Sequence, residues 1–397
     1  MRSPSGRCGF TYAGARGTEH CCYRETWRET GRCVWHADTG DDEGKPNEAL
    51  IAVREDTAAR RQTGDHGPTE LLDGAELTGE TLPEGIDLTG VSLRDADLSD
   101  ADLYGATLRG ADLRDADLAD ADLERGDLTR ANCRDANLHE ADLLDATLRE
   151  ATLRATDLTD AVLRGATLAD ADLEGAFLNR ADLFDADLAD TRLYGAFLAT
   201  ARINDGTTLD ERCVYDPART ETEPEPGGEG PDLHTKATST YQELEKLCAE
   251  NALLSAQSRY FVRRQDIHTA AHREEGRWGR WLRARVSRAV LLYGESPFRV
   301  LGTAAGIILL STVLYPLGYL RNSATGELLT YSTPARPVAL AHTLLDSLYF
   351  STLSFTTMTY GHFVPVGGGK FLTMIETGSG VVLIALLVFV FGRRATR

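Results

Sequence analysis

A five-residue periodicity constrains this chain more than any other feature. Neither an α-helix at 3.6 residues per turn nor a strand with period 2 can keep such a pattern on one face. Across residues 88–203, 24 positions spaced five apart hold 22 Leu, Ile203 and Cys133, and 19 of the positions two residues earlier are Ala. Each repeat is therefore expected to form one side of a coil that turns a corner every five residues, with Leu and Ala pointing inward.

The repeat changes phase once. Leu72, Leu77 and Leu82 keep the period of five but stand one residue out of register with the later repeats. An insertion or bulge is therefore expected within residues 83–87, as a corner distortion or an N-terminal cap. The slot before Leu is mostly Asp, Asn or Thr, whose side chains satisfy backbone groups at turns. Cys133 is expected to be a core residue.

This pattern resembles the pentapeptide-repeat family over residues 69–215. The resemblance implies a right-handed, quadrilateral parallel β-helix with four repeats in each coil. About six coils would stack to roughly 30 Å at ordinary strand spacing.

The charge balance argues against a nucleic-acid partner, because 42 Lys and Arg stand against 61 Asp and Glu, a formal charge of −19. The chain has only four Lys, and an acidic, Lys-poor surface predicts a halophilic protein. The acidic residues of the repeats are interpreted as a solvated surface. The alternative is a DNA mimic acting on a topoisomerase, as the family resemblance allows.

Two aromatic residues interrupt the acidic slot of the repeats. Phe177 and Phe197 both replace the usual Asp, and twenty residues apart they should stack in successive coils. They predict a docking surface, covered either by this chain's own C-terminal segment or by an unknown cytoplasmic partner.

Residues 216–235 are rich in Pro, Gly and Glu and predict a flexible acidic linker, so that the solenoid moves relative to the C-terminal part of the chain. Residues 240–297 predict cytoplasmic or interfacial helices. Their Arg-rich end, with Trp278 and Trp281, suits membrane lipid, although a helical hairpin packed against the solenoid is the alternative.

Two apolar runs are long enough to cross a membrane. Residues 300–320 carry no charge, and residues 371–392 carry only Glu376. Arginines precede the first run and follow the second, and the polar N-terminus predicts no secretory signal. We therefore expect a cell-membrane protein with two transmembrane helices and both termini in the cytoplasm.

Between these runs, residues 340–355 are apolar but too short and too polar to span, which predicts a re-entrant helix. This segment and the residues after it resemble the pore helix and selectivity filter of a two-transmembrane potassium channel. The resemblance implies a pore domain over residues 298–397 that assembles as a homotetramer, with K⁺ as the permeant ion. The filter positions fall on Thr357, Met358, Thr359, Tyr360 and Gly361.

Three positions depart from the family pattern. Thr359 stands where the family has its first filter glycine, which leaves the selectivity between K⁺ and other monovalent cations open. Met358 replaces Val. His362 replaces the usual Asp at the pore mouth, which removes a carboxylate there and adds an imidazole.

The second span carries three further candidate residues. Glu376 is expected either to mark the ion pathway or to find a partner behind the filter. Gly378 and Gly380 predict an inner-helix hinge, and close helix packing explains them equally well.

The N-terminal segment, residues 1–45, is rich in Cys and His. Seven Cys in the chain, four of them within the first 33 residues, do not suggest a full disulfide framework. A structural zinc site is one interpretation, and buried or redox-active thiols are the other. The candidate ligands are Cys8, Cys21, Cys22, Cys33 and His36.

No phosphate loop, nucleophile elbow or paired catalytic motif is present, so no enzyme is expected. The sequence predicts a multidomain ion channel subunit in which a cytoplasmic β-helix and an α-helical linker precede a two-helix pore domain. A membrane-anchored interaction scaffold with a degenerate pore is the alternative.

Overall fold

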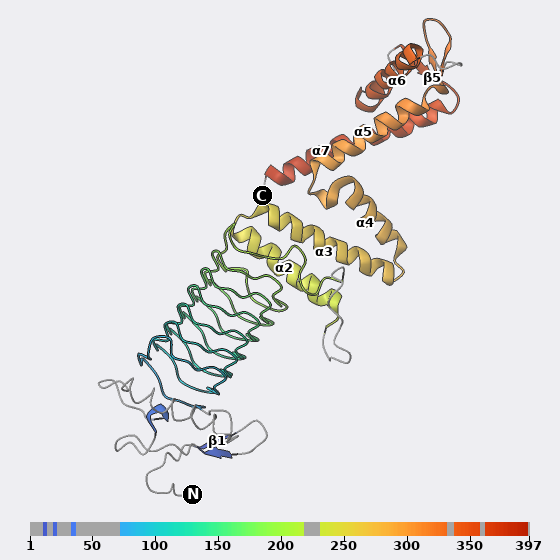
Figure 1. Ribbon diagram of the computed structural model, residues 1–397. Helices are drawn as coiled ribbons and strands as arrows, with labels where there is room; N and C mark the ends of the chain where they lie inside the picture. The colour runs from blue at the N-terminus through green and yellow to red at the C-terminus, as the bar shows by residue number, and fades with distance from the viewer. Residues whose placement is uncertain are drawn as a thin grey trace. The chain divides into compact units, whose positions relative to one another are not determined.

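The computed structural model describes residues 11–13, 19–21, 33–36, 72–217, 231–331, 337–357 and 362–395. The chain divides into two compact units, Met1–His268 and Thr269–Arg397, hereafter the N-terminal and C-terminal units. Figure 1 shows a coiled solenoid in the first unit and long helices in the second.

Parallel bridges between successive coils build the solenoid. Asp97 pairs with Asp117, Asp102 with Asp122, and the pattern continues at a spacing of twenty residues. Four repeats of five therefore make one coil, as predicted. Glu76 pairs with Asp97 across twenty-one residues, which confirms the one-residue insertion expected within residues 83–87.

The Leu and Ala positions form the core of the solenoid, and nearly all of them are fully buried. The Asp before each Leu turns the backbone: the Asp97 carboxylate accepts a hydrogen bond from Ser99 N at 3.1 Å, and Asp102 accepts one from Tyr104 N at 3.1 Å. The last residue of most repeats has a positive φ, for example 57° at Asp100 and 65° at Gly105. That conformation explains why Asp and Gly recur there.

Cys133 lies inside the coil, as predicted, and is fully buried. Burial raises the pKa of its thiol to about 12. Thr156 replaces an Ala in the neighbouring coil, and its hydroxyl donates to the Cys133 carbonyl at 2.6 Å. The polar substitution is therefore satisfied within the core.

Helices α2 (Leu233–Glu250) and α3 (Leu254–Glu274) form a hairpin that closes the C-terminal end of the solenoid. The Asn251 side chain accepts from Ile203 N at 3.0 Å and donates to the Ala201 carbonyl at 2.8 Å. The Tyr241 hydroxyl donates to the Asp216 carboxylate at 2.6 Å. The two Asn251 contacts take up backbone groups that the last coil would otherwise leave unpaired.

This docking corrects two expectations about the linker. α2 begins at Leu233, inside the predicted linker of residues 216–235, and residues 218–230 lie outside the described part. The solenoid does not move freely relative to α2, because Tyr241 and Leu244 belong to the same buried core as the Leu positions of the repeats.

A mostly buried carboxylate ties α2 to the side of the solenoid. Glu174 accepts hydrogen bonds from the Tyr215 hydroxyl at 2.6 Å and from Lys236 Nζ at 2.9 Å, and Arg154 pairs with it at 2.7 Å. Lys236 also lies over the rings of Tyr194 and Tyr215. Burial raises the pKa of Glu174, but these hydrogen bonds and charges outweigh it, so the pKa lies below its ordinary value.

At the other end of the solenoid, the turn η1 (Val34–His36) lies against the first coil. Glu76 N donates to the Trp35 carbonyl at 3.0 Å, and Trp35 is fully buried. Strands β1 (Thr11–Ala13) and β2 (Glu19–Cys21) pair antiparallel. η1 therefore covers part of the first coil, a contact that the sequence did not predict.

The C-terminal unit is mainly helical, with one small sheet. Helix α4 (Trp278–Leu291) turns through η2 (Leu292–Gly294) into α5 (Pro297–Leu314), and α6 (Pro337–Thr357) and α7 (Gly369–Ala395) follow. Strands β3 (Leu317–Asn322), β4 (Leu328–Thr330) and β5 (Phe363–Pro365) form a sheet in the order β4-β3-β5.

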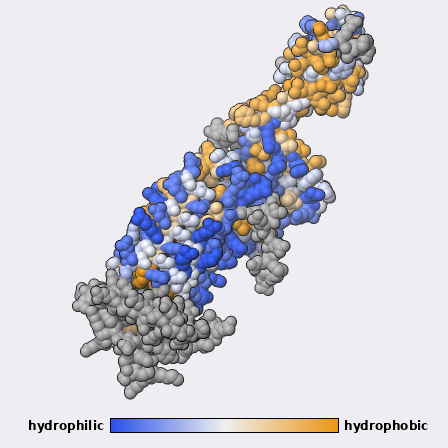
Figure 2. Space-filling model, in the orientation of Figure 1, coloured by the Kyte–Doolittle hydropathy of each residue, from blue (hydrophilic) through white to orange (hydrophobic). Residues whose placement is uncertain are grey.

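The first apolar run does not form a single helix. It was predicted as a span over residues 300–320, but α5 ends at Leu314, just before Pro316, and the run continues as β3. α5 and residues Gly369–Gly392 of α7 are still long and apolar enough to cross a membrane. Much of their apolar surface is exposed, and Figure 2 shows hydrophobic residues over the C-terminal unit and hydrophilic ones over the solenoid.

Candidate ion-conduction site

The predicted re-entrant helix is α6, which packs against both α5 and α7. It runs over Pro337–Thr357, slightly longer than the predicted residues 340–355. The strand before it, β4, and the strand after it, β5, both pair with β3. The segment between them therefore leaves one sheet and returns to the same sheet, instead of crossing to the opposite side.

The predicted filter lies at the C-terminal end of α6. Thr357 is the last residue of this helix, and its side chain is outside the described part of the chain. Met358, Thr359, Tyr360 and Gly361 also lie outside the described residues. The structure therefore describes the backbone of Thr357, where the filter segment begins, and His362, which follows it, and the roles of the filter residues remain predictions.

His362, the predicted mouth residue, follows the filter segment and is exposed. Its backbone carbonyl accepts hydrogen bonds from Ser323 N at 2.9 Å and from the Ser323 hydroxyl at 2.7 Å. β5 then pairs with β3, with Asn322 opposite Phe363 and Leu320 opposite Pro365. The sheet thus fixes the point where the chain emerges from the filter segment.

Glu376 lies at the junction of the three helices and is only 1% exposed. Its carboxylate accepts hydrogen bonds from the Tyr315 hydroxyl at 2.5 Å and from the Ser351 hydroxyl. Tyr315 Oη also lies 3.0 Å from Thr373 Oγ1, and Ser351 Oγ lies 3.1 Å from the Ile308 carbonyl oxygen. The acid therefore links the C-terminal end of α5, the middle of α6 and α7.

The two glycines of the predicted hinge differ in their surroundings. A Cβ atom at Gly380 would overlap the Phe355 carbonyl oxygen of α6, whereas a Cβ at Gly378 would meet no described atom within 4 Å. Between the same two helices, the Thr377 hydroxyl of α7 donates to the Ser354 carbonyl of α6 at 3.0 Å. Gly380 therefore permits the close approach of α6 and α7, and bending at either glycine remains a prediction.

Phe177 and Phe197, the predicted docking pair, stack in successive coils. Their ring centroids are 5.1 Å apart and their planes differ by 1°. They remain 40% and 50% exposed. In the described residues of the N-terminal unit nothing encloses them, so the cover expected from the chain's own C-terminal segment is not found there.

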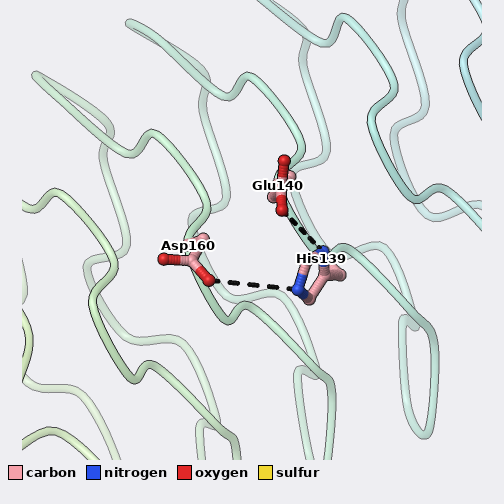
Figure 3. A group of neighbouring side chains, drawn as sticks. All are labelled: His139, Glu140 and Asp160. Atoms are coloured by element: carbon pink, nitrogen blue, oxygen red, sulfur yellow. Dashed lines mark ion pairs between the residues drawn. The ribbon is translucent and has the colours of Figure 1, made fainter.

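A group of three potential metal ligands lies on the outer surface of the solenoid (Figure 3). His139 lies 3.6 Å from the Glu140 carboxylate and 3.9 Å from that of Asp160. Asp160 is also bound through both oxygens by the Arg180 guanidinium, which holds the pKa of Asp160 below its ordinary value. No sequence motif predicted this group, and its contacts are those of an ion-pair cluster on the surface.

The predicted zinc ligands are described only in part. Cys33 Sγ lies 3.1 Å from His36 Nδ1, and His36 Nε2 lies 3.1 Å from the Asp73 carbonyl oxygen. Both side chains are buried. Cys8 and Cys22 lie outside the described residues, and of Cys21 only the backbone in β2 is described.

Two parts of the chain match known families. Residues 86–199 match pentapeptide repeats, in eight copies over 86–125, 116–154, 127–165 and 161–199, and residues 303–397 match a family described as ion channel. No match was found among curated proteins.

Several solved structures are similar to this chain. HetL, a pentapeptide repeat protein involved in heterocyst differentiation regulation from the cyanobacterium Nostoc, is 26% identical over 40% of this chain and 80% of its own, with a TM-score of 0.26. Rfr23 from the cyanobacterium Cyanothece 51142 is 24% identical over 40% of this chain and 99% of its own, with a TM-score of 0.25. A pentapeptide repeat protein from the Arabidopsis thaliana thylakoid lumen is 25% identical over 34% and 71%, with a TM-score of 0.16.

The fold and the family matches define a membrane protein that joins a four-sided β-helix to a pore-loop domain. The chain carries pentapeptide repeats and, after them, a C-terminal domain that matches the ion channel family. Both matched families are non-enzymatic, in agreement with the absence of a catalytic motif in the sequence.

Proposed function

We propose that this chain is a subunit of a homotetrameric channel for monovalent cations, with K⁺ as the main permeant ion. Four filter segments, residues 357–361, would surround one path and replace the water of the ion with backbone carbonyls. In this proposal Thr359 takes the position of a filter glycine, and His362 lies at the outer mouth.

The observation that carries the proposal is the return of the chain to one sheet on both sides of α6. β4 and β5 pair with the same strand, β3, so residues 331–362 enter and leave on one side. Glu376, Tyr315 and Ser351 hold α6 against α5 and α7. A rigidly held pore helix keeps the filter backbone in a fixed position, which ion coordination requires.

The topology proposed for the membrane places both termini in the cytoplasm. Six arginines stand at positions 277–299, before α5 or in its first turn, and Arg393, Arg394 and Arg397 lie at the end of α7 or beyond. Positive residues that flank spans favour the cytoplasmic side. The sheet of β3, β4 and β5 then faces outward, next to the filter.

In the same proposal the solenoid is a cytoplasmic regulatory or docking domain. The stacked pair Phe177 and Phe197 offers the exposed apolar surface to which a cytoplasmic partner would bind. The docked α2–α3 hairpin supports a regulatory role, because it joins the solenoid to the helices that lead to the pore.

The test measures cation flux through full-length protein in liposomes. Gly361→Ala should abolish flux, because a filter backbone tolerates few side chains at its glycines. Gly306→Ala is the matched control, since a Cβ there meets no described atom within 4 Å. Undiminished flux in Gly361→Ala would refute the assignment of the filter to residues 357–361.

We also propose a structural zinc ion in the N-terminal segment. The contact of His36 Nε2 with the Asp73 carbonyl places the proton on Nε2 and leaves the Nδ1 lone pair facing Cys33 Sγ. This donor set suits zinc. Full-length protein should hold about one zinc per chain, and Cys33→Ser should lose it, whereas Cys133→Ser should not. Metal-free protein with its thiols intact would favour buried thiols instead.

A further inference from the structure

One face of α6 is exposed along the whole helix. Its exposed residues recur every three or four positions, which is the spacing of a single helix face. They include Val338, His342, Asp346, Tyr349, Thr352 and Thr356. The opposite face, which carries Ser347, Phe350 and Ser354, is buried, and α6 packs against α5 and α7.

The exposed face is too polar to lie against lipid. The Thr352 and Thr356 hydroxyls donate to carbonyls of their own helix, at 2.8 and 2.7 Å. Within the part of the chain that the structure describes, the side chains of His342, Asp346 and Tyr349 have no hydrogen-bond or ion-pair partner. A carboxylate at membrane depth is costly unless it is paired or faces water. Because α6 lies between two apolar spans in the sequence, its exposed face needs protein or water against it.

Two cations of the same unit also have no acidic partner. Lys370 in the first turn of α7 and Arg321 in β3 are exposed, and neither forms an ion pair with a described residue. One copy of the chain therefore presents an unpaired acid and unpaired cations on its surface. A second copy has the complementary charges for both.

The register between α6 and α7 favours Lys370 as the partner. Two hydrogen bonds between these helices, at Ser351 and Ser354, join residues 25 and 23 positions apart. The residue numbers rise together in both helices, so the helices run in the same direction. The same separation places Asp346 level with residues 369–371, where α7 begins.

Cyclic symmetry keeps this level from one subunit to the next. Rotation about an axis normal to the membrane leaves every residue at its own depth. Asp346 of one subunit therefore meets residues at the depth of Lys370 in its neighbour. Arg321 lies opposite Val364 in the sheet, six residues before Lys370, and so lies farther out.

We propose that Asp346 of each subunit forms an ion pair with Lys370 of the neighbouring subunit, which buries the exposed face of α6 in the subunit contact. The contact is heterologous, so four identical pairs close the ring. This inference rests on the proposed function as a homotetrameric channel and names the residues that join its subunits.

The first test reverses charges in full-length protein and measures the tetramer fraction by native mass spectrometry over a dilution series. Asp346→Lys should raise the dissociation constant at least about thirtyfold, because two ammonium groups then meet. Adding Lys370→Asp should restore most of the loss. Asp346→Lys with Arg321→Asp is the matched control and should stay dissociated.

Three results would overturn the proposal. Undiminished tetramer in Asp346→Lys would show that the carboxylate faces water. No rescue by Lys370→Asp, or equal rescue by Arg321→Asp, would show that Lys370 is not its partner.

Cross-linking in trans tests whether the two residues belong to different subunits, without a change of charge sign. A tagged Asp346→Cys chain is co-expressed with an untagged Lys370→Cys chain and oxidised with copper phenanthroline in air. A disulfide-linked dimer of one tagged and one untagged chain is expected. Tagged Asp346→Cys with untagged Arg321→Cys controls for the cysteines already in the chain. A mixed dimer no more abundant than in this control would contradict the pairing.

Assembly and ion flux fail independently. Tetramers that depend on this pair but pass no cations would leave the subunit contact in place and remove the channel function. Tetramers and flux that both persist in Asp346→Lys would remove the ion pair alone.

Discussion

In the solenoid Leu143 is fully buried and most carboxylates are at least partly exposed, whereas in the C-terminal unit Glu376 is buried and apolar residues such as Val388 and Phe389 are exposed. The difference arises from the surroundings of each unit. In water, burial of Leu is favourable and exposed acids are solvated. In lipid, exposed apolar side chains are favourable, and every polar group needs a hydrogen-bond partner inside the protein.

The two units also differ in how their contacts are distributed along the chain. Each coil of the solenoid contacts the coil twenty residues away, and the same Leu, Ala and Asp positions recur. The C-terminal unit is fixed by single contacts between distant residues, for example Tyr315 with Glu376. The first kind of order is visible in a sequence, and the second is not.

The largest expected effect is in the solenoid core. Leu143→Ala should lower the local free energy of unfolding by about 2–5 kcal/mol, because it leaves a cavity between coils. Leu144→Ala, the next residue, points outward and should cost about 0.5 kcal/mol. Hydrogen exchange of the amides around the Leu143 N to Val162 O bond measures both. Equal effects would refute the inward assignment of the Leu slot.

The close approach of α6 and α7 gives the next effect. Gly380→Ala should destabilise the C-terminal unit by about 1–3 kcal/mol, because its Cβ overlaps the Phe355 carbonyl oxygen. Gly378→Ala has open space and should leave the thermal unfolding midpoint nearly unchanged. A lower midpoint for Gly378→Ala than for Gly380→Ala would contradict this packing.

The buried acid Glu376 gives the third effect. Glu376→Ala should cost about 1–2 kcal/mol, the usual range for hydrogen bonds within a membrane, and should also reduce ion flux because α6 loses its link to α5 and α7. Glu376→Gln keeps a carbonyl acceptor and should retain more of the stability and more of the ion flux than Glu376→Ala. Glu327→Ala, an exposed acid of the same unit, serves as the control. Full flux in Glu376→Ala would show that this link does not position the filter.

The smallest effect concerns Glu174, an acid held in place on the solenoid. The pKa of Glu174 in the folded protein is lower than its unfolded value of roughly 4.3. The stability that Glu174 contributes is therefore complete above the unfolded pKa and is lost as the pH falls through the folded pKa. Acidification should therefore loosen α2 from the solenoid. Glu174→Gln should cost about 1 kcal/mol near neutral pH and flatten this acid dependence. Hydrogen exchange in α2 at several pH values measures it, and an unchanged pH profile in the variant would contradict the assignment.

The sequence predicted the solenoid in detail because its rule is local and repeated. The Leu slot, the inward Ala, the turn-forming Asp and the insertion within residues 83–87 are all consequences of the period of five. The positive φ at the last residue of most repeats was not predicted, although the recurrence of Asp and Gly at that position indicates it.

At the candidate site, the helices and their order could be predicted from the sequence, but most side-chain contacts between them could not. Apolar runs identified α5, α6 and α7, and Glu376 was expected either to mark the ion pathway or to find a partner. Its partners Tyr315 and Ser351 are 61 and 25 residues away, and only the fold brings them together.

The structure of two further segments depends on tertiary contacts that a local sequence pattern does not show. The residues of β3 were predicted as the end of a membrane-spanning helix. They form a strand instead, because they pair with β4 and β5. The docking of α2 and α3 on the solenoid was expected only as an alternative, because Asn251 finds its backbone partners in the last coil, far away in the sequence.

In the proposed function, residues 357–361 form a cation-selective filter in a channel. The most direct measurement is the reversal potential of full-length protein in a bilayer with K⁺ on one side and Na⁺ on the other, in high salt. We predict a current whose reversal potential shifts toward the K⁺ equilibrium potential. The absence of current at every voltage and pH would contradict the claim and favour a membrane-anchored scaffold with a degenerate pore.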